Sequence, residues 1–398
     1  MGVARACPAC GAGDAEPVHR VRLRTPDGHP LQGGYEVVSC TRCGTGYADA
    51  DVDQRSYDRY YAERAKYAAD LATVANVTGE EPAWVRARFD DAARRISRLV
   101  PPGASVLDIG CSTGSLLAAL GRAGFEDVRG LDPSPACALL ADRVHGVRVD
   151  VGSLHRVPTG IGTFDCVCLT GVLEHVWDVD GAMAAITSLV RPGGAVYVEV
   201  PDASRYLDPF IAPFEDFHTE HVNHFSGPTL AALGRRFGLA TVWHGAADND
   251  LVPGATAAVV AVCWRTDASP ASAPRRDDAL ARSLHAFTAR SAESWRRMDD
   301  RLRGDLGPSP TYVLWGMGEL AMKLLAGTVL AERAPAALVD GNPARHGLCF
   351  GGVPVSPPGA LRGGEGPIVV GSLLRAASIR TAVAARGLPN PVIELSAA

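Results

Sequence analysis

A short apolar run that ends in a glycine-bearing turn constrains the fold of this chain more than any other feature. Residues 107–117 read Leu-Asp-Ile-Gly-Cys-Ser-Thr-Gly-Ser-Leu-Leu, which predicts a strand, a tight turn and the start of a helix. Glycines allow the backbone to approach a ligand closely, and the first turn of a helix presents free N–H donors. The turn therefore predicts an α/β domain that holds a nucleotide-type cofactor at the end of its first strand.

The identity of the cofactor depends on the residues inside this turn and on the following strand. A dinucleotide fingerprint, G-x-G-x-x-G, uses its middle glycine to let backbone approach a pyrophosphate. Gly110 and Gly114 are present, but Ser112 replaces the middle glycine, and Asp132 stands where it could accept both ribose hydroxyls. The pattern favours S-adenosylmethionine over NAD, and an ordinary turn with a surface aspartate is the alternative. We predict that the cofactor contacts Asp108, Gly110, Cys111, Ser112, Gly114, Asp132, Pro133, Ser153, Thr170 and Gly171.

Strand and helix patterns alternate from residue 104 to about 245, as a doubly wound parallel sheet requires. A long helix follows, and its apolar stripe predicts a core contact, with a dimer seam as the alternative. A second, smaller α/β pattern then begins at Tyr312–Trp315 and Gly316-Met-Gly318. We therefore expect three domains, at 1–75, 76–265 and 266–398. The predicted strands are Ser105–Ile109, Val128–Asp132, Val147–Val151, Phe164–Leu169, Ala195–Val200 and Thr256–Trp264, and the stripe is Leu280, Leu284, Phe287, Trp295, Met298 and Leu302.

Size, charge and apolar patterning exclude several classes of function. A chain of 398 residues exceeds one average domain, and its net charge of −5 provides no basic field for nucleic acid. The N-terminus lacks an apolar signal segment, and no apolar run reaches the 18 or so residues that a membrane helix needs. We expect a cytoplasmic protein that acts on a small molecule, with no nucleic-acid or membrane partner.

Four of the ten cysteines form two C-x-x-C-G turns near the N-terminus. Cys7 and Cys10 make the first turn, and Cys40 and Cys43 make the second after a spacer of 29 residues. Each turn can aim two sulfurs at one point, which suits tetrahedral Zn²⁺. Four thiolates leave no open coordination position, so we predict a structural zinc, with four reduced thiols as the alternative.

Two histidine segments carry the candidate chemistry. His175 ends the run Thr170–His175 just beyond the fourth predicted strand, at the sheet edge where ligands bind in open α/β folds. The segment 215–225 contains His218, His221 and His224 among three acids. Metal binding and general base catalysis are both compatible with such a set, and because no H-E-x-x-H motif is present we favour a base.

The order of these motifs resembles the nucleotide-sugar C-methyltransferase family over the whole chain. The resemblance rests on the paired C-x-x-C turns, Asp-Ile-Gly-Cys-Ser-Thr-Gly, Leu-Glu-His, Glu-His-Val-Asn-His-Phe-Ser and the terminal Trp-Gly-Met-Gly unit. It implies a zinc-binding N-terminal domain, a class I S-adenosylmethionine domain and a C-terminal Rossmann-like domain that helps to enclose the substrate. The implied acceptor is a nucleotide sugar or a related glycosidic or natural-product precursor.

The same resemblance implies roles for individual residues. His221 would remove a proton from the sugar carbon beside a 4-keto group, Glu220 would tune His221, and His175 with a tyrosine from residues 57–67 would support the enolate oxygen. His218 stands where the family commonly has tyrosine, and the usual Trp-Asn near the last strand is missing. An O-methyltransferase is therefore the alternative enzyme, and a zinc-ribbon scaffold protein is the alternative without catalysis.

Overall fold

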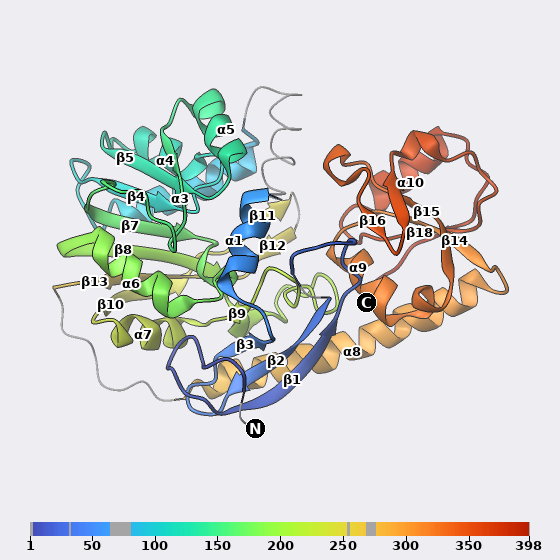
Figure 1. Ribbon diagram of the computed structural model, residues 1–398, viewed down its shortest axis with the longest axis horizontal. Helices are drawn as coiled ribbons and strands as arrows, with labels where there is room; N and C mark the ends of the chain where they lie inside the picture. The colour runs from blue at the N-terminus through green and yellow to red at the C-terminus, as the bar shows by residue number, and fades with distance from the viewer. Residues whose placement is uncertain (1–2, 32, 64–80, 253–254, 268–275, 398) are drawn as a thin grey trace. The chain divides into compact units, whose positions relative to one another are not determined.

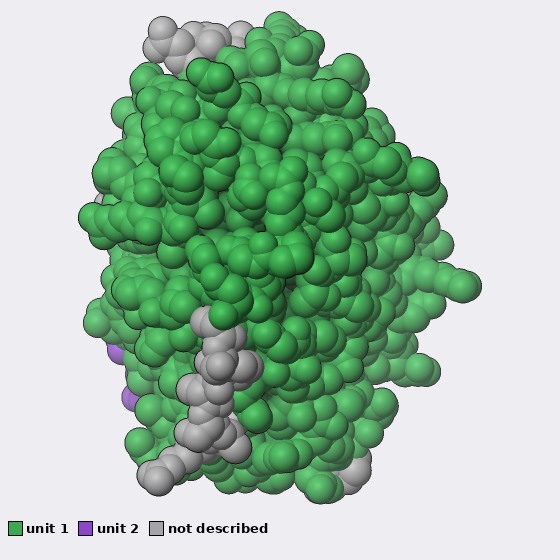
Figure 2. All heavy atoms as spheres, turned by 90° about the vertical axis from the view of Figure 1, so that its left-hand side faces the viewer, with its two compact units in different colours: residues 1–17, 38–209, 220–284 green, residues 18–37, 210–219, 285–398 purple. Residues whose placement is uncertain are grey.

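The chain forms two compact units that are interleaved along the sequence. The structure is a computed structural model, which describes residues 3–31, 33–63, 81–252, 255–267 and 276–397. The first unit comprises residues 1–17, 38–209 and 220–284, and the second comprises 18–37, 210–219 and 285–398 (Figure 2). Neither unit is a single continuous stretch of chain, whereas the three expected domains are consecutive, and their boundaries stay a prediction.

A seven-stranded sheet forms the centre of the first unit, in the order β10-β13-β8-β7-β4-β5-β6. Strand β13 is antiparallel to both of its neighbours, and the strands from β8 to β6 are parallel. The chain runs outward from β4 in one direction and from β7 in the other, so a ligand crevice is expected at their carboxyl ends. The strands are β4 (Val106–Ile109), β5 (Val128–Asp132), β6 (Val149–Val151), β7 (Phe164–Thr170), β8 (Val190–Pro201), β10 (Ala240–Ala246) and β13 (Val259–Arg265).

Helices cover both faces of this sheet, which confirms the doubly wound prediction. Alternate residues of β7 point to opposite faces: Cys166 and Cys168 join one core cluster, and Val167 and Leu169 join the other. Figure 1 shows α3, α4 and α5 on one side of the sheet and α6 and α7 on the other. The helices are α3 (Ala83–Ile96), α4 (Ser115–Arg122), α5 (Pro135–His145), α6 (Val179–Leu189) and α7 (Gly227–Arg236).

The paired cysteine turns belong to a smaller sheet with the order β1-β2-β3-β9. Both turns have one hydrogen-bond pattern: the Gly11 N–H donates to the Cys7 carbonyl at 2.9 Å, and Gly44 donates to Cys40 at 2.9 Å. The strand β9, which follows Glu220-His221, pairs with β3, so the cysteine segment and the histidine segment share one sheet. The strands are β1 (Ala15–Arg22), β2 (Gly34–Cys40), β3 (Gly46–Asp49) and β9 (Asn223–His224).

A six-stranded sheet, β16-β17-β15-β14-β18-β19, forms the second unit, as the restarted α/β pattern predicts. Its central strands are parallel, and alternate residues of β14 enter two separate cores. The elements are β14 (Thr311–Trp315), α9 (Glu319–Gly327), β15 (Ala334–Val339), β16 (Cys349–Phe350), β17 (Val353–Ser356), β18 (Ile368–Val370), α10 (Ala376–Ala385) and β19 (Val392–Ile393).

The long predicted helix is α8 (Asp278–Leu306), which runs from the first unit into the second. Its stripe residues Leu284, Phe287 and Leu302 are buried within the chain, so the stripe is core and not an open dimer seam.

The single strand expected at 256–264 is divided into β12 (Ala255–Ala257) and β13, and β12 pairs with β11 (Asn249–Val252). Tyr67 lies outside the described residues, and so does the loop predicted from sequence at 267–274, apart from Asp267. No helix in the described part of the chain is long and apolar enough to span a membrane.

Candidate active site

The turn after β4 and the carboxylate of Asp132 lie together at the carboxyl end of the sheet, and we call them the ribose cradle because the sequence predicts that Asp132 binds the ribose of the cofactor. Asp132 accepts hydrogen bonds from the Ser112 N–H at 2.8 Å and from the Ser134 N–H at 2.9 Å, one on each carboxylate oxygen. Each oxygen keeps a lone pair for a ribose hydroxyl. A Cβ on Gly110 would lie 2.6 Å from the Val172 side chain, so glycine is required where the turn meets the loop after β7.

Buried carboxyl groups surround this cradle. Asp108 is 1 % exposed and Glu174 is 3 % exposed, and among the described residues Asp108 Oδ1 and Glu174 Oε2 have no hydrogen-bond partner. Burial raises the pKa of Asp108 well above its usual value and raises the pKa of Glu174 to about 8. An opposite charge nearby favours the ionised form of such carboxyl groups, and the sulfonium and ammonium groups of S-adenosylmethionine would supply positive charge.

The remaining predicted cofactor residues lie along the same sheet edge. Cys111 is buried in the turn, Pro133 follows β5, and Ser153 lies just beyond β6. Thr170 ends β7, and the N–H of Gly171 donates to the Glu199 carbonyl at 2.8 Å. Their contacts with the cofactor stay predictions.

Replacing Asp132 by asparagine is expected to weaken binding of S-adenosylmethionine by about 10- to 100-fold, because a hydrogen bond to a charged group contributes about 1.5–3 kcal/mol. Isothermal titration calorimetry measures the effect. Asp340 is a matched control, since it accepts from the Met317 and Asn342 N–H groups at 2.7 Å each in the second unit. If Asp132→Asn and Asp340→Asn lost the same affinity for S-adenosylmethionine, the assignment of the donor site to the end of β5 would be contradicted.

His175 and His221 lie together beyond β7. Their ring centroids are 4.9 Å apart, with the edge of one ring facing the other. His175 ends a short 3-10 turn, η1 (Leu173–His175), and its Nδ1 lies 3.1 Å from the Glu220 carbonyl oxygen. Because a carbonyl only accepts, Nδ1 carries the proton, and Nε2 faces Glu174 Oε1 at 3.7 Å. The sequence motifs at 175 and 221 are thus brought into one site.

Tyrosines from α1 (Gln54–Glu63) complete this site, as the sequence suggested for residues 57–67. The Tyr60 hydroxyl donates to Glu220 Oε1 at 2.9 Å, and the Tyr61 ring lies edge-on to His175 at 5.8 Å. Glu220 is 1 % exposed. Its bond to Tyr60 was not apparent from the sequence, which suggested only a link to His221.

The three histidines of the segment 215–225 occupy three different environments. His221 joins His175, whereas His218 belongs to the second unit, where its carbonyl accepts from the Tyr35 hydroxyl at 2.8 Å. His224 is a core histidine at 0 % exposure, hydrogen-bonded to the Tyr206 hydroxyl at 2.9 Å. A catalytic role for His218 stays a prediction.

Burial lowers the pKa of His224 to about 3, below the ordinary histidine value of 6.5. As the pH falls from 6.5 toward 3, His224 binds a proton in the unfolded chain but not in the folded chain. The free energy of unfolding should therefore fall by about 1.4 kcal/mol per pH unit from this group. Urea unfolding between pH 7 and 5 should show that the free energy of unfolding falls less steeply with pH in His224→Gln than in the wild type. If the free energy fell equally steeply in both proteins, His224 would not be a buried neutral imidazole.

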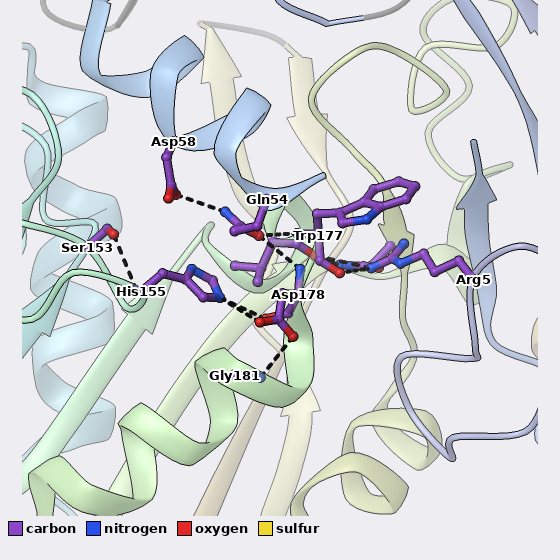
Figure 3. Close-up of polar contacts among 10 residues, drawn as sticks. Arg5, Gln54, Asp58, Ser153, His155, Trp177, Asp178 and Gly181 are labelled. Atoms are coloured by element: carbon purple, nitrogen blue, oxygen red, sulfur yellow. Dashed lines mark hydrogen bonds and ion pairs between the residues drawn. The ribbon is translucent and has the colours of Figure 1, made fainter. Parts of the chain in front are cut away.

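Loop 176–178, which follows His175, is held by side chains that no sequence motif marked (Figure 3). Gln54 Oε1 accepts from the Trp177 N–H at 3.0 Å and from the Asp178 N–H at 2.9 Å. His155 Nε2 lies 2.9 Å from the Asp178 carbonyl, and the Asp178 side chain caps α6 through Gly181 N–H. Helix α1 is therefore fixed directly against the loop that presents His175.

The four N-terminal sulfurs have the spacing of a tetrahedral metal site. The Sγ atoms of Cys7 and Cys43 are 3.5 Å apart, those of Cys10 and Cys40 are 3.6 Å apart, and all four lie within 4.8 Å of one another. Zn–S bonds of about 2.3 Å place tetrahedral sulfurs roughly 3.8 Å apart, so the cluster could bind zinc. Ligand atoms of Glu174, His175 and His221 also lie within 4.8 Å of one another and could hold an ion.

A family model described as a methyltransferase domain matches residues 84–244. These residues include nearly all of α3, the ribose cradle, His175 and His221, strands β4 to β8, and most of β10. Residues 84–244 therefore match a methyltransferase domain, and they have the class I fold. The single antiparallel strand, β13, lies between β8 and β10, which is the class I arrangement.

Two known relatives each match less than two fifths of this chain. Ubiquinone biosynthesis O-methyltransferase of Rhizobium johnstonii is 32% identical over 165 residues, which is 38% of this chain and 64% of that protein. The protein of the same name from Xanthomonas axonopodis pv. citri is 35% identical over 109 residues, covering 26% of this chain and 45% of the relative. This chain thus spans less than two thirds of these relatives.

Among solved structures, the Burkholderia thailandensis 1,6-didemethyltoxoflavin-N1-methyltransferase, with bound 1,6-didemethyltoxoflavin and S-adenosylhomocysteine, is similar with a TM-score of 0.39 and 21% identity. The alignment covers 56% of this chain and 96% of that chain. A second, the possible histamine N-methyltransferase of Thermotoga maritima, has a TM-score of 0.35 and 19% identity, covering 46% of this chain and 90% of the other.

Proposed function

We propose that the chain transfers the methyl group of S-adenosylmethionine to a carbon atom of an activated keto sugar or a related natural-product precursor. The observation that carries the proposal is the contact between His175 and His221 beside the ribose cradle, with ring centroids 4.9 Å apart. Val172, three residues before His175, packs on Gly110 of the cradle, which connects the histidine loop to the donor turn.

In this proposal His221 acts as the general base. It removes a proton from the carbon beside the carbonyl, and the electrons of that C–H bond form the enolate. S-adenosylmethionine, when bound, supplies an electrophilic methyl group whose bond electrons return to sulfur as the new C–C bond forms. His221 is left as an imidazolium ion, which returns its proton to solvent.

Neighbouring groups would orient the base and balance charge. Because Nδ1 of His175 donates to the Glu220 carbonyl, Nε2 can donate to an enolate oxygen only when the ring carries both protons. An ionised Glu174, 3.7 Å away, would stabilise that form. A metal ion at these three side chains would occupy the lone pair that His221 needs as a base, so we propose a base and not a metal ligand.

We further propose that Cys7, Cys10, Cys40 and Cys43 bind a structural zinc, on the support of their sulfur spacing. The N-terminal module would hold this metal, and the C-terminal residues 266–398 would be a Rossmann-like domain on the substrate side. The second proposal rests on the family resemblance alone.

O-methylation is the second candidate, and the names of the O-methyltransferase relatives favour it. In that reaction His221 would take the proton of a hydroxyl group instead of a carbon acid. A nucleotide 4-keto sugar incubated with the protein in deuterated water, without the methyl donor, separates the two. Exchange of deuterium into the carbon beside the carbonyl, and a C-linked methyl group once the donor is added, is the expected result; an O-linked methyl group without exchange would establish the alternative.

A further inference from the structure

Arg5 is an arginine near the N-terminus whose guanidinium group lies among backbone carbonyls of the first unit (Figure 3). Its Nη2 donates to the Trp177 carbonyl at 2.7 Å and also packs over the Trp177 ring, with Cζ 4.3 Å from the ring centroid. The other acceptors are Asn223 Oδ1 at 2.8 Å and the carbonyls of Val222 at 3.1 Å, Val176 at 3.3 Å and Ala48 at 3.5 Å.

These acceptors adjoin the histidine pair. Val176 directly follows His175, and Val222 directly follows His221. One guanidinium group therefore holds the backbone next to each histidine, from two segments that are far apart in the chain.

The two segments, 173–177 and 220–223, are also bonded to each other, and we call them the paired segments. The Val222 N–H donates to the Glu174 carbonyl at 2.8 Å. The Asn223 amide donates to the carbonyls of Leu173 and Val176 at 2.7 Å each, and the same amide accepts from Arg5 through its oxygen. Arg5 thus completes a hydrogen-bond network in which the other residues belong to the two segments that contain His175 and His221.

The backbone of Arg5 is fixed by the cysteine module. The N–H groups of Ala4 and Arg5 donate to Asp49 Oδ1 at 3.0 and 3.1 Å, and Cys7 lies two residues further along the chain. Strand β3 of this module pairs with β9, where Tyr47 lies opposite Asn223. The guanidinium group therefore extends from the folded cysteine module into the paired segments.

We propose that Arg5 is a positioning residue that fixes His175 and His221 relative to each other and so makes the histidine pair depend on the folded cysteine module. The inference rests on the proposed function of His221. Arginine suits this role because its planar fork carries five N–H donors, whereas lysine has three donors around a single point. Displacement of a catalytic group by about 1 Å costs up to roughly 10²-fold in rate.

The test compares Arg5→Lys with a matched control, Arg236→Lys. Arg236 also donates to a carbonyl of the cysteine module, that of Pro8 at 3.0 Å, but it donates in addition to Asp180 and not to the paired segments. Four quantities are measured for each variant: zinc content, affinity for S-adenosylmethionine, kcat, and the Nδ1–H signal of His175 in ¹⁵N-histidine NMR, assigned with His175→Asn.

We expect Arg5→Lys to lose roughly 10²-fold in kcat, with zinc content and donor affinity unchanged and the His175 Nδ1–H signal weakened or shifted. Arg236→Lys should match the wild type in all four measurements. In Arg5→Ala, millimolar guanidinium ion should restore part of kcat, whereas it should have no such effect on the wild type.

Two results would overturn the positioning role: an unchanged Nδ1–H signal in Arg5→Lys, or loss of zinc and donor binding together with kcat, which would indicate general structural damage. A changed signal with wild-type kcat would support the role of Arg5 and would instead refute the catalytic role of the histidines. The NMR signal needs no acceptor substrate, so failure of this inference and failure of the proposed function remain distinguishable.

Discussion

Replacing His221 by asparagine is expected to reduce kcat by about 10²- to 10⁴-fold, the usual contribution of a general base. Asparagine keeps a polar side chain of similar reach but cannot accept a proton from carbon. The ribose cradle at Asp132 is formed by other segments of the chain, so affinity for S-adenosylmethionine should stay within about twofold, well under the 1.4 kcal/mol of a tenfold change. Transfer of a labelled methyl group to the acceptor gives kcat, and calorimetry gives the affinity.

The matched control for this variant is His244→Asn, on the exposed strand β10 of the same unit. It should retain wild-type kcat. If His221→Asn also retained wild-type kcat, the base would have to be another group, and the proposed mechanism would be wrong. Deuterium exchange into the acceptor without the donor should disappear together with kcat in His221→Asn, because both require the same proton removal.

Replacing one of the proposed zinc ligands, as in Cys40→Ser, is expected to abolish zinc binding and destabilise the cysteine module by several kcal/mol. The free energy of binding structural zinc to small domains is about 10–16 kcal/mol and appears as folding energy. Elemental analysis should fall from one zinc ion per chain to none, and the thermal midpoint should fall with it.

Cys349→Ser is the control, because Cys349 is a partly exposed thiol of the second unit that lies outside the sulfur cluster. It should change neither the metal content nor the thermal midpoint. A wild-type protein that contains no zinc, and that a chelator does not destabilise, would show that the four cysteines are reduced thiols without a metal.

Local patterns in the sequence predicted much of the architecture. A parallel sheet buried on both faces produces short apolar runs, and β5 spans the predicted residues 128–132. The run at 164–169 also became a strand, β7, with only one further residue. The donor turn was predictable for a related reason, since Gly110 meets Val172 at a distance that permits no side chain.

The contacts that complete the active site were not predictable from such patterns. The bonds of Arg5 reach Val222, 217 residues further along the chain, and a single arginine carries no periodicity or motif. Tyr60 could be assigned only to a helix that bears several tyrosines, because its bond to Glu220 spans 160 residues. The separation of His221 from the core histidine His224 depends on strand pairing with β3, which the histidine spacing does not reveal.

The division of the two units along the chain has a consequence for biosynthesis. Residues 18–37 belong to the second unit, but most of that unit, 285–398, is translated roughly 250 residues later. At about 5–20 residues per second, the early segment emerges some 10–50 s before its partners. Strands β1 and β2 can pair at once, but hydrogen bonds such as that from the Arg24 N–H to the Met322 carbonyl cannot form in that interval. A nascent chain that stops before residue 285 should therefore require chaperone protection to remain unaggregated.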